Sequence, residues 1–451
     1  MDQATSGETT VGRARFPLWA QIVAALVLGI ALGIAVGPKP FLGNFGTEQL
    51  GRLGMLVIRA LKTLAVPLVA FVILDSLLRF EIQGRQGVRL IRICLTNVSV
   101  AMVIGLTLTN LIEPGVHLRA LFAPLLAADA PDLAHGAKPA HLDPVSAFES
   151  MIPGSVAGPF VENTVLPAAL LALLIGLALR RTRRDHEGLP TAASFDTVRG
   201  AVQLIAESLQ RALIWVVLLT PFAAFALVAR AVSVAGVTAL LGLWAFLLTI
   251  LLGFALHGLV YYPLIAWWRG GKSPRVYLTG ARDALVTGIA TNSSLATVPV
   301  TLRCLTERIG ISPTSARLSA CLGTNLNNDG IALYEAMAVL AIAQACGMEL
   351  GLAQQAAVVG ASVMAGMGIA GIPEAGLVML PVVLTAAGMP DVVAAAAVTL
   401  VVPVDWILAR CRTAMNVLSD MVVAIVLDRD PAAQQRAIPQ SGLRTELPSD
   451  P

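Results

Sequence analysis

A short polar motif inside a long apolar region does most to limit what this chain can fold into. Asn327-Asn328-Asp329-Gly330 puts two amides and a carboxylate within the region Ser312–Cys346. A charged side chain at membrane depth costs about 2.5–3.5 kcal/mol on insertion scales and therefore usually faces a cavity inside the protein. Other apolar segments also carry polar groups, which are Asn292-Ser293-Ser294, Asp405, Arg412, Asn416 and Asp420. Repeated burial of this kind is typical of membrane transport proteins.

The composition supports a chain embedded in lipid. Of the 451 residues, 56% are hydrophobic and only 13% are charged, which is about half the charged fraction of soluble domains. The net charge is +3 and the arginines are scattered through loops, so no nucleic-acid partner is expected. The five cysteines show no metal-binding spacing and are expected to be small buried hydrophobes.

Several apolar segments approach or exceed the about 20 residues that a spanning helix needs. Six candidate spans precede residue 269, namely Pro17–Val36, Leu53–Leu78, Val88–Ile112, Val165–Leu179, Ala201–Val232 and Val237–Trp268.

We interpret the polar residues 1–16 as a cytoplasmic tail before a retained first span, and 429–451 as a disordered cytoplasmic tail. We interpret 113–160 as a variable extracellular connection without chemistry.

Two later segments have the pattern of paired half-helices that meet at an unwound tip. Polar residues 291–294 and Pro299 break the region Arg275–Cys304, whereas four glycines and Pro373 break the region Met364–Gly376. Irregular backbone at membrane depth is tolerated only inside protein or beside a watery cavity. A pair of such interruptions is the best sequence indication of a transporter's binding site. Two kinked but otherwise ordinary helices are the alternative.

The distribution of positive charge predicts the orientation of the chain. Arginines cluster after the second, fourth and sixth candidate spans, and the alternate loops hold few positive charges. This asymmetry places both termini in the cytoplasm. The first interrupted segment then enters from the cytoplasm and the second from outside, which is the arrangement that inverted repeats produce.

The last apolar helix carries a stripe of polar side chains. Asp405, Arg412, Asn416 and Asp420 fall on one face at about 100° per residue. The planar fork of Arg412 suits a carboxylate. A structural ion pair between Arg412 and one of the two aspartates is the alternative.

Oxygen atoms near this stripe could bind a small cation. Asp420 and Asp329 supply carboxylates, and Asn327 and Asn416 supply amide oxygens. Exposed N–H groups at the tip near Ser294 would favour an anion. An anion site beside cation sites favours symport, because each ligand then stabilises the binding of the other.

Four motifs in the second half are specific when taken together. They are Asn292 to Pro299, Asn327 to Ala336, Gly371 to Gly376, and Val404 to Asp420. They resemble the serine-rich first hairpin tip, the NMDGT-ALYEA helix, the second hairpin tip and the last helix of the glutamate transporter family, the dicarboxylate/amino acid:cation symporters. The similarity is strong over roughly 275–428 and compatible in layout from residue 17 onward.

The resemblance implies a fold and an assembly. The fold would be an all-α membrane protein with eight transmembrane helices, two re-entrant helical hairpins, inverted repeats and elevator-like movement. Residues 17–268 would form a membrane region of scaffold helices, except that the third and sixth spans would join a transport core of residues 269–428. The protein would be a homotrimer in the bilayer of the inner (plasma) membrane.

The resemblance also implies the ligands. Arg412 would bind the distal carboxylate of a small anionic substrate, and the other residues expected at the substrate are Ser293, Ser294, Thr413, Asn416, Gly376, Ile331 and Ala409. Na⁺ is the implied coupling ion, and its expected ligands are Gly323, Asn325, Asn327, Asp329, Gly366, Met367, Ile369, Asn416 and Asp420. Glu335 matches a position linked to proton coupling, which makes H⁺ a second candidate ion. No organic cofactor is implied.

Departures from the family pattern affect the choice of substrate. Amino-acid carriers hold an aspartate for the substrate's amine where this chain has Ala409, so a plain dicarboxylate is favoured. Thr413 is retained as in amino-acid carriers and favours the opposite choice. Ile331 replaces a substrate-facing threonine. Asn97 and Val98 fall near the usual Thr-Ser pair of a third sodium site, which leaves that site and the ion count open.

The sequence therefore predicts a symporter that imports a small dicarboxylate or acidic amino acid with Na⁺, and we favour a C4-dicarboxylate over aspartate or glutamate. An ion channel is the alternative of another class, although the mixed charges of the stripe do not suggest a pore. No enzymatic activity is predicted. A nucleophilic Ser293 or Ser294 would need a nearby base, and His257 is the only histidine within a span.

Overall fold

The structure is a computed structural model that describes residues 17–79, 84–129, 152–186, 192–325, 327–368 and 375–429. Helices dominate this part of the chain, and it contains no strand beyond an isolated antiparallel bridge between Leu42 and Phe45. The all-helical prediction is confirmed for these residues. The tail 1–16, most of the tail 429–451 and the segment 130–151 of the long connection lie outside the described residues.

The helices follow one another along the chain in the following order. The first half contains α1 (Leu18–Val36), α2 (Thr47–Arg79), α3 (Gly84–Ile112), α4 (Pro114–Asp129), α6 (Gly158–Val161), α7 (Val165–Asp185), α8 (Ala192–Val217), α9 (Thr220–Ala235), the 3₁₀-helix η1 (Val237–Gly242), α10 (Leu243–Ala255), the π-helix η2 (Leu256–Tyr261) and α11 (Tyr262–Trp268). The second half contains α12 (Pro274–Thr291), α13 (Ser294–Arg303), η3 (Cys304–Ile309), α14 (Pro313–Arg317), η4 (Leu318–Leu322), η5 (Gly323–Asn325), α15 (Asp329–Ala345), α16 (Leu352–Gly368), α17 (Ala375–Ala386) and α18 (Asp391–Asp428).

Some of these helices are long and apolar enough to cross a membrane. Within the described residues they are Thr47–Leu78, Gly87–Ile112, Leu240–Trp268 and Val392–Asp428. A further candidate is the pair Ser194–Val217 and Thr220–Ala235, which bends by 46° within the predicted span Ala201–Val232. Pro221 lies in the first turn of α9, where it is compatible with a new helix start but not with an unbroken helix. The count of eight spans stays a prediction.

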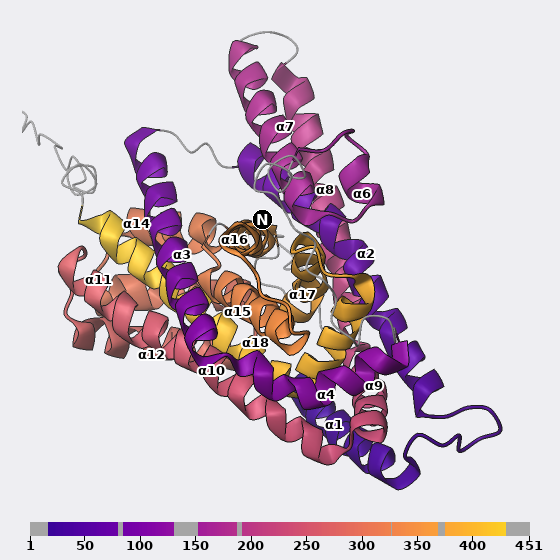
Figure 1. Cartoon of the computed structure of the whole chain (residues 1–451). Helices are drawn as coiled ribbons and strands as arrows, with labels where there is room; N and C mark the ends of the chain where they lie inside the picture. The colour runs from indigo at the N-terminus through magenta and orange to yellow at the C-terminus, as the bar shows by residue number, and fades with distance from the viewer. Residues whose placement is uncertain are drawn as a thin grey trace, which may run out of the picture.

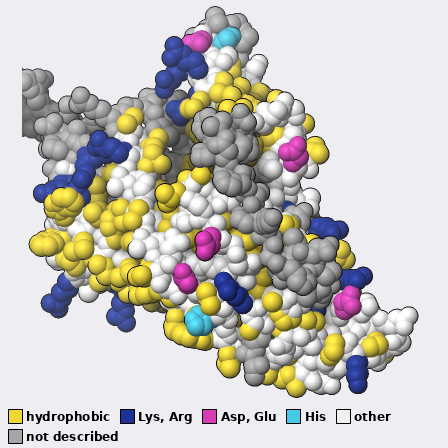
Figure 2. Space-filling view, viewed as in Figure 1, with side chains coloured by type: hydrophobic (Ala, Val, Ile, Leu, Met, Phe, Trp, Pro, Cys, Tyr) yellow, Lys and Arg dark blue, Asp and Glu magenta, His cyan; other side chains and the backbone are white. Residues whose placement is uncertain are grey.

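The surface suits a lipid environment. Large apolar side chains are exposed on α1, α3, α7, α8 and α10, and patches of that extent normally mark a lipid or protein contact. Figure 2 shows hydrophobic side chains over much of the visible face, with lysines and arginines mostly toward its edges.

The helices pack in two groups. The first group contains α1, α2, α7, α8 and α9, with α2 in contact with the last three. The second group surrounds α15, which contacts α3, α10, α16, α17 and α18. In Figure 1, α7 and α8 project at one end of the molecule, and α15 lies among the helices of the second group. Every residue of α15 except Gln344 is buried, so this helix is the centre of the core.

The segment 275–304 forms a helical hairpin. Asn292 connects α12 to α13 with a left-handed backbone (φ 50°), so the break lies within the interruption that the sequence indicates. The chain then returns along α12, because Arg308 pairs with Asp283 at 2.5 Å between Nη2 and Oδ2. The helices α16 and α17 also pack against each other. Of the second predicted tip, Gly371 to Gly376, residues 371–374 lie outside the described residues.

The long connection 113–160 contains a packed helix in its first part, which the sequence analysis did not predict. Residues 114–129 form α4, and this helix packs against α10, α15 and α18. Pro114 fits the first helical position, and Leu118, Leu121, Phe122 and Leu125 follow the i, i+3, i+4, i+7 spacing of a buried face. Pro114 and Gly115 together resemble a turn, so the sequence did not reveal this helix.

The burial of α4 can be tested by mutation. Phe122 is completely buried, so Phe122→Ala leaves a cavity and is expected to reduce the free energy of unfolding by about 3–5 kcal/mol. The control is Leu111→Ala at the end of α3, where the side chain is 78% exposed. Thermal unfolding of the two variants in detergent tests the packing, and equal melting temperatures would show that α4 is not a core helix.

Candidate substrate and cation site

The stripe on α18 is buried as the sequence analysis expected. Asp405, Arg412, Asn416 and Asp420 lie on this one helix despite Pro403, and each is at most 3% exposed. Their polar groups therefore face other helices of the core rather than lipid or water. Two groups of contacts result, one around Arg412 and one around Asp420.

Arg412 is held on several sides. Its Nη1 donates to Asp405 Oδ1 at 2.8 Å and its Nη2 to Asp405 Oδ2 at 3.3 Å, which is a bidentate pair. Its Cζ lies 4.1 Å from the centre of the Tyr334 ring of α15, within the range of a cation–π contact. The predicted alternative of a pair with Asp405 is thus present, but this pair uses only two of the five guanidinium donors.

The first turn of α17 lies against the guanidinium. A Cβ atom added at Gly376 would come within 2.6 Å of Arg412 Nη2 and still closer to Nη1 and Cζ. Glycine is therefore the only residue that fits without moving the arginine. The start of α17 thus brings backbone, including the N-terminal end of a helix, directly to the predicted anion-binding group.

The tip of the first hairpin contacts the residue after Arg412. Thr413 Oγ1 donates to Asn292 Oδ1 at 3.0 Å and to the carbonyl of Ala409 at 3.1 Å. Ser293 caps α13 by accepting from the N–H of Ala296. Ser294 is buried, and its hydroxyl has no hydrogen-bond partner within the part of the chain that is described.

Asp329 anchors the second group of contacts. It is the first residue of α15 and follows the non-helical Asn327 and Asn328. Its Oδ2 accepts from Tyr262 Oη at 2.9 Å and from Ser419 Oγ at 2.7 Å. Asn327 Nδ2 donates to the same Ser419 at 2.7 Å. The break in the helix thus places an amide and a carboxylate beside α18.

Asp420 completes this group. Its Oδ2 accepts from Thr324 Oγ1 at 2.6 Å, and its other oxygen faces Gly323. One oxygen each of Asn327, Asp329 and Asp420 is buried without a hydrogen-bond partner among the described residues. Buried oxygens of this kind are costly when left unpaired. The donor set of carboxylate and amide oxygens fits a small hard cation such as Na⁺.

Other predicted residues lie around these two groups. Asn416 Oδ1 accepts from the N–H of Gly330 at 2.9 Å, which connects α18 to the start of α15. The carbonyl of Gly366 accepts from Asn328 Nδ2 at 2.8 Å, so the end of α16 reaches the same place. Ile331 and Ala409 are buried.

The remaining predicted residues are placed only in part. Glu335 is completely buried, and neither of its carboxylate oxygens has a partner among the described residues. The side chain of Asn325 is not described, and Ile369 lies outside the described residues.

Comparison of the sequence with known proteins identifies the family of this chain. The sequence profile of the sodium:dicarboxylate symporter family matches residues 18–430. The chain belongs to the sodium:dicarboxylate symporter family. It is 27% identical to excitatory amino acid transporter 4 of Mus musculus over 497 aligned residues, which cover 95% of this chain and 85% of that protein.

Two further relatives support the same family assignment. The identity is 28% over 443 residues with excitatory amino acid transporter 3 of Mus musculus, covering 88% of this chain and 82% of that protein. It is 41% over 179 residues with an excitatory amino acid transporter of Caenorhabditis elegans, covering 40% and 35%. The predicted resemblance to the glutamate transporter family is confirmed.

Membership establishes the general activity. The family is one of membrane transporters rather than enzymes, and it couples the symport of acidic amino acids or dicarboxylates to a cation, with sodium named in its description. The apolar helices of this symporter agree with a multi-pass membrane protein. The roles of individual residues are not decided by this membership.

Sequence reasoning missed several side chains of this symporter's site. Tyr262 and Ser419 hold Asp329, and Tyr334 covers Arg412. His257 was considered only as a catalytic base, but its Nε2 lies 3.5 Å from Asp329 Oδ2. It belongs to the π-helix η2, a type of irregularity that often marks functional sites. Single polar or aromatic residues in apolar helices gave no signal strong enough to identify the other three.

The close approach of Gly376 to Arg412 can be tested by mutation. Gly376→Ala is expected to weaken the binding of a carboxylate substrate at least about tenfold, since the new methyl displaces the guanidinium. Gly360→Ala on α16 is the matched control, because its added Cβ meets only Leu166 Cδ2 at 3.9 Å. Calorimetric titration of both variants with succinate and aspartate tests this, and equal affinities in the two variants would contradict it.

Proposed function

We propose that this symporter takes up a small dicarboxylate together with Na⁺, and that the substrate is a C4-dicarboxylate. The observation that carries the proposal is the buried Arg412, whose fork faces Asp405 and lies against the first turn of α17. A substrate carboxylate would accept hydrogen bonds from the guanidinium N–H groups that do not donate to Asp405. The hydroxyl of Ser294 and the amide of Asn416 would hold the other end of the substrate.

Ala409 supports the choice of a dicarboxylate. It lies one helical turn before Thr413, which donates to its carbonyl, and it is buried. Its methyl group cannot bind an ammonium group, whereas a carboxylate at this position could. Uptake of aspartate or glutamate is the second candidate, because Thr413 is retained and bonded to the tip residue Asn292. The relatives named above are excitatory amino acid transporters, which also favours this candidate.

The cation would be held by the oxygens that lack partners. Asp420 with the backbone near Gly323, and Asp329 with Asn327, supply carboxylate and amide oxygens in the same region of the core. We propose that Na⁺ binds there and that H⁺ is a second coupling ion through Glu335. Na⁺ would supply positive charge that offsets the buried carboxylates, and Ser419 keeps Asn327 and Asp329 together.

We also propose the arrangement of the protein in the membrane. The chain would form eight spans and two re-entrant hairpins, with both termini in the cytoplasm of a plasma-membrane homotrimer. The group of helices around α15 would move as the transport core against the group that contains α2 and α9. The tight packing of α1 with α9 and of α2 with α7, α8 and α9 supports this division, and α16, α17 and α18 contact this group across the boundary.

Uptake into proteoliposomes tests the proposed substrate. Labelled succinate is expected to accumulate under an inward Na⁺ gradient and not after the gradient is collapsed, and aspartate is expected to accumulate less. Arg412→Lys, which keeps the charge but loses the planar fork, is expected to abolish most uptake. The control is Arg211→Lys on an exposed part of α8. Failure of both substrates to accumulate would overturn the proposal.

Ala409→Asp tests the role of Ala409 directly. The new carboxylate could bind an ammonium group and would repel a dianion, so the ratio of aspartate to succinate uptake is expected to rise at least about tenfold. The control is Ala409→Ser, which adds a polar group without charge. An unchanged ratio in Ala409→Asp would remove Ala409 from the argument, and Thr413 and the named relatives would then favour aspartate or glutamate.

A further inference from the structure

A second cavity lies away from Arg412, between the two groups of helices. Its volume is about 660 Å³, within the range of sites that hold small organic ligands. Four cationic side chains line it, namely Arg52, Arg59 and Lys62 of α2 and Arg230 of α9. The only carboxylate among the lining residues that the structure describes is Glu162. Arg52 also pairs with Glu48, at 2.6 Å between Nη2 and Oε1. The described lining therefore keeps an excess of positive charge that comes from Arg59, Lys62 and Arg230.

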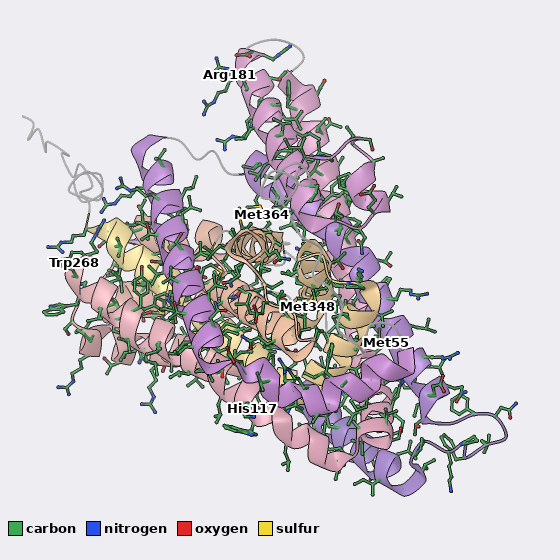
Figure 3. All side chains as sticks on the ribbon, in the orientation of Figure 1. Met55, His117, Arg181, Trp268, Met348 and Met364 are labelled. Atoms are coloured by element: carbon green, nitrogen blue, oxygen red, sulfur yellow. The ribbon has the colours of Figure 1, made fainter. Side chains whose placement is uncertain are left out.

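Two of these cations lie deep along a spanning helix. Arg59 and Lys62 follow the first residue of α2 by roughly 18 and 22 Å at 1.5 Å per residue. A cation at such depth is stable only where it faces a watery cavity or an anion. Arg59 is exposed and Lys62 is half-buried, as expected for side chains that face this space. Met55, labelled in Figure 3, lines the same cavity and marks its place on α2.

Arg230 reaches the cavity from the neighbouring helix. Its side chain crosses α2 at Gly51, where an added Cβ would come within 3.0 Å of Arg230 Cβ and 3.1 Å of its Cγ. Arg230 as a whole is only 6% exposed. Close packing against Gly51 thus holds an arginine that is more than nine-tenths buried in the wall of the cavity.

The opposite wall comes from the second group of helices, and the side chains described there are uncharged. It includes Pro381 and Thr385 of α17 and two alanines of α18. Lys62 Nζ donates to Thr385 Oγ1 at 3.4 Å, so one cation bridges the two walls. Asn163 Nδ2 donates to the carbonyl of Lys62 at 3.1 Å and keeps the neighbouring Glu162 at the cavity. Among the described residues, an anion in this space would meet cations on one side and uncharged side chains on the wall of α17 and α18.

We propose that this cavity is a second oxyanion site, separate from Arg412, that binds a carboxylate- or phosphate-bearing anion with at least two negative charges. Two sources share this chemistry. One is a small soluble dianion that enters from the aqueous phase, and the other is the headgroup of an anionic lipid at the boundary between the two helix groups. The site rests on the cavity and its charges and does not depend on which substrate is transported.

Binding by the full-length protein in nanodiscs tests the proposal. The background variant is Arg412→Ala, or Arg412→Lys should the alanine variant fail to fold, so that binding at the buried site is removed. Into this background are placed Arg59→Gln with Lys62→Gln, or, as a matched control, Arg211→Gln on an exposed part of α8. Circular dichroism and thermal unfolding confirm that the variants are folded.

Two arms distinguish the sources. Calorimetric titration with succinate and with inorganic phosphate, in discs of pure phosphatidylcholine, measures a soluble anion. Native mass spectrometry of protein from discs that also contain phosphatidylglycerol measures a retained lipid. The paired substitution is expected to weaken binding in at least one arm by about tenfold or more, as the loss of two charged hydrogen-bond donors predicts.

The outcomes are decisive in each case. Loss of binding in the first arm assigns the site to a soluble dianion, and loss in the second arm assigns it to a lipid headgroup. Binding that is absent in both arms, or that is equal in the paired variant and the Arg211→Gln control, would overturn the second site. Uptake of succinate or aspartate by the unaltered protein would still stand in that case, because Arg412 carries that proposal.

Discussion

The ion pair between Arg412 and Asp405 is the interaction on which the rest of the site depends. Both groups lie on α18, within a helix that is apolar enough to span a membrane. Desolvating such charges costs several kcal/mol, and removing one partner of a buried pair costs about 3–5 kcal/mol. The surrounding helices contribute what the pair lacks, since α15 supplies the ring of Tyr334 and α17 supplies backbone at Gly376. The guanidinium is therefore held in place before any ligand binds.

The balance of charge around this pair explains why an anion would need a cation. The buried aspartates Asp329, Asp405 and Asp420 outnumber Arg412 among the residues in contact around Arg412 and Asp420. A dianion brought to Arg412 alone would add negative charge to a low-dielectric region where like charges repel strongly. Positive ions at the oxygens of Asp329 and Asp420 would offset that repulsion. In our proposal, symport follows from this balance, and each ligand raises the affinity for the other by the same factor.

The sequence predicted those features that depend on strong local signals. The break at Asn292 and the stripe from Asp405 to Asp420 could be read because polar residues interrupt apolar helices at a regular spacing. The contacts of Ser419 and Tyr262 with Asp329 could not, because they join helices that are far apart in the chain and neither residue is unusual in its own helix.

The helix α4 and the basic cavity were missed for different reasons. Pro114 and Gly115 resemble a turn, although proline also fits the first turn of a helix. The cations of the cavity, on α2 and α9, could not be recognised as a group in the sequence, because only the fold brings Arg230 to the same cavity as Arg59 and Lys62. Charge clusters that form between helices thus need the tertiary structure, whereas charges on one helix face can be found by their spacing.

The most direct test of coupling measures both ligands on one purified sample. The dissociation constant of succinate, or of aspartate if that ligand binds, is determined with Na⁺ and with choline in its place. The Na⁺ affinity is then determined with and without a saturating concentration of the same anion. The account predicts that Na⁺ tightens anion binding by roughly 5- to 150-fold and that the anion tightens Na⁺ binding by an equal factor. An anion affinity that is the same in Na⁺ and in choline would contradict it.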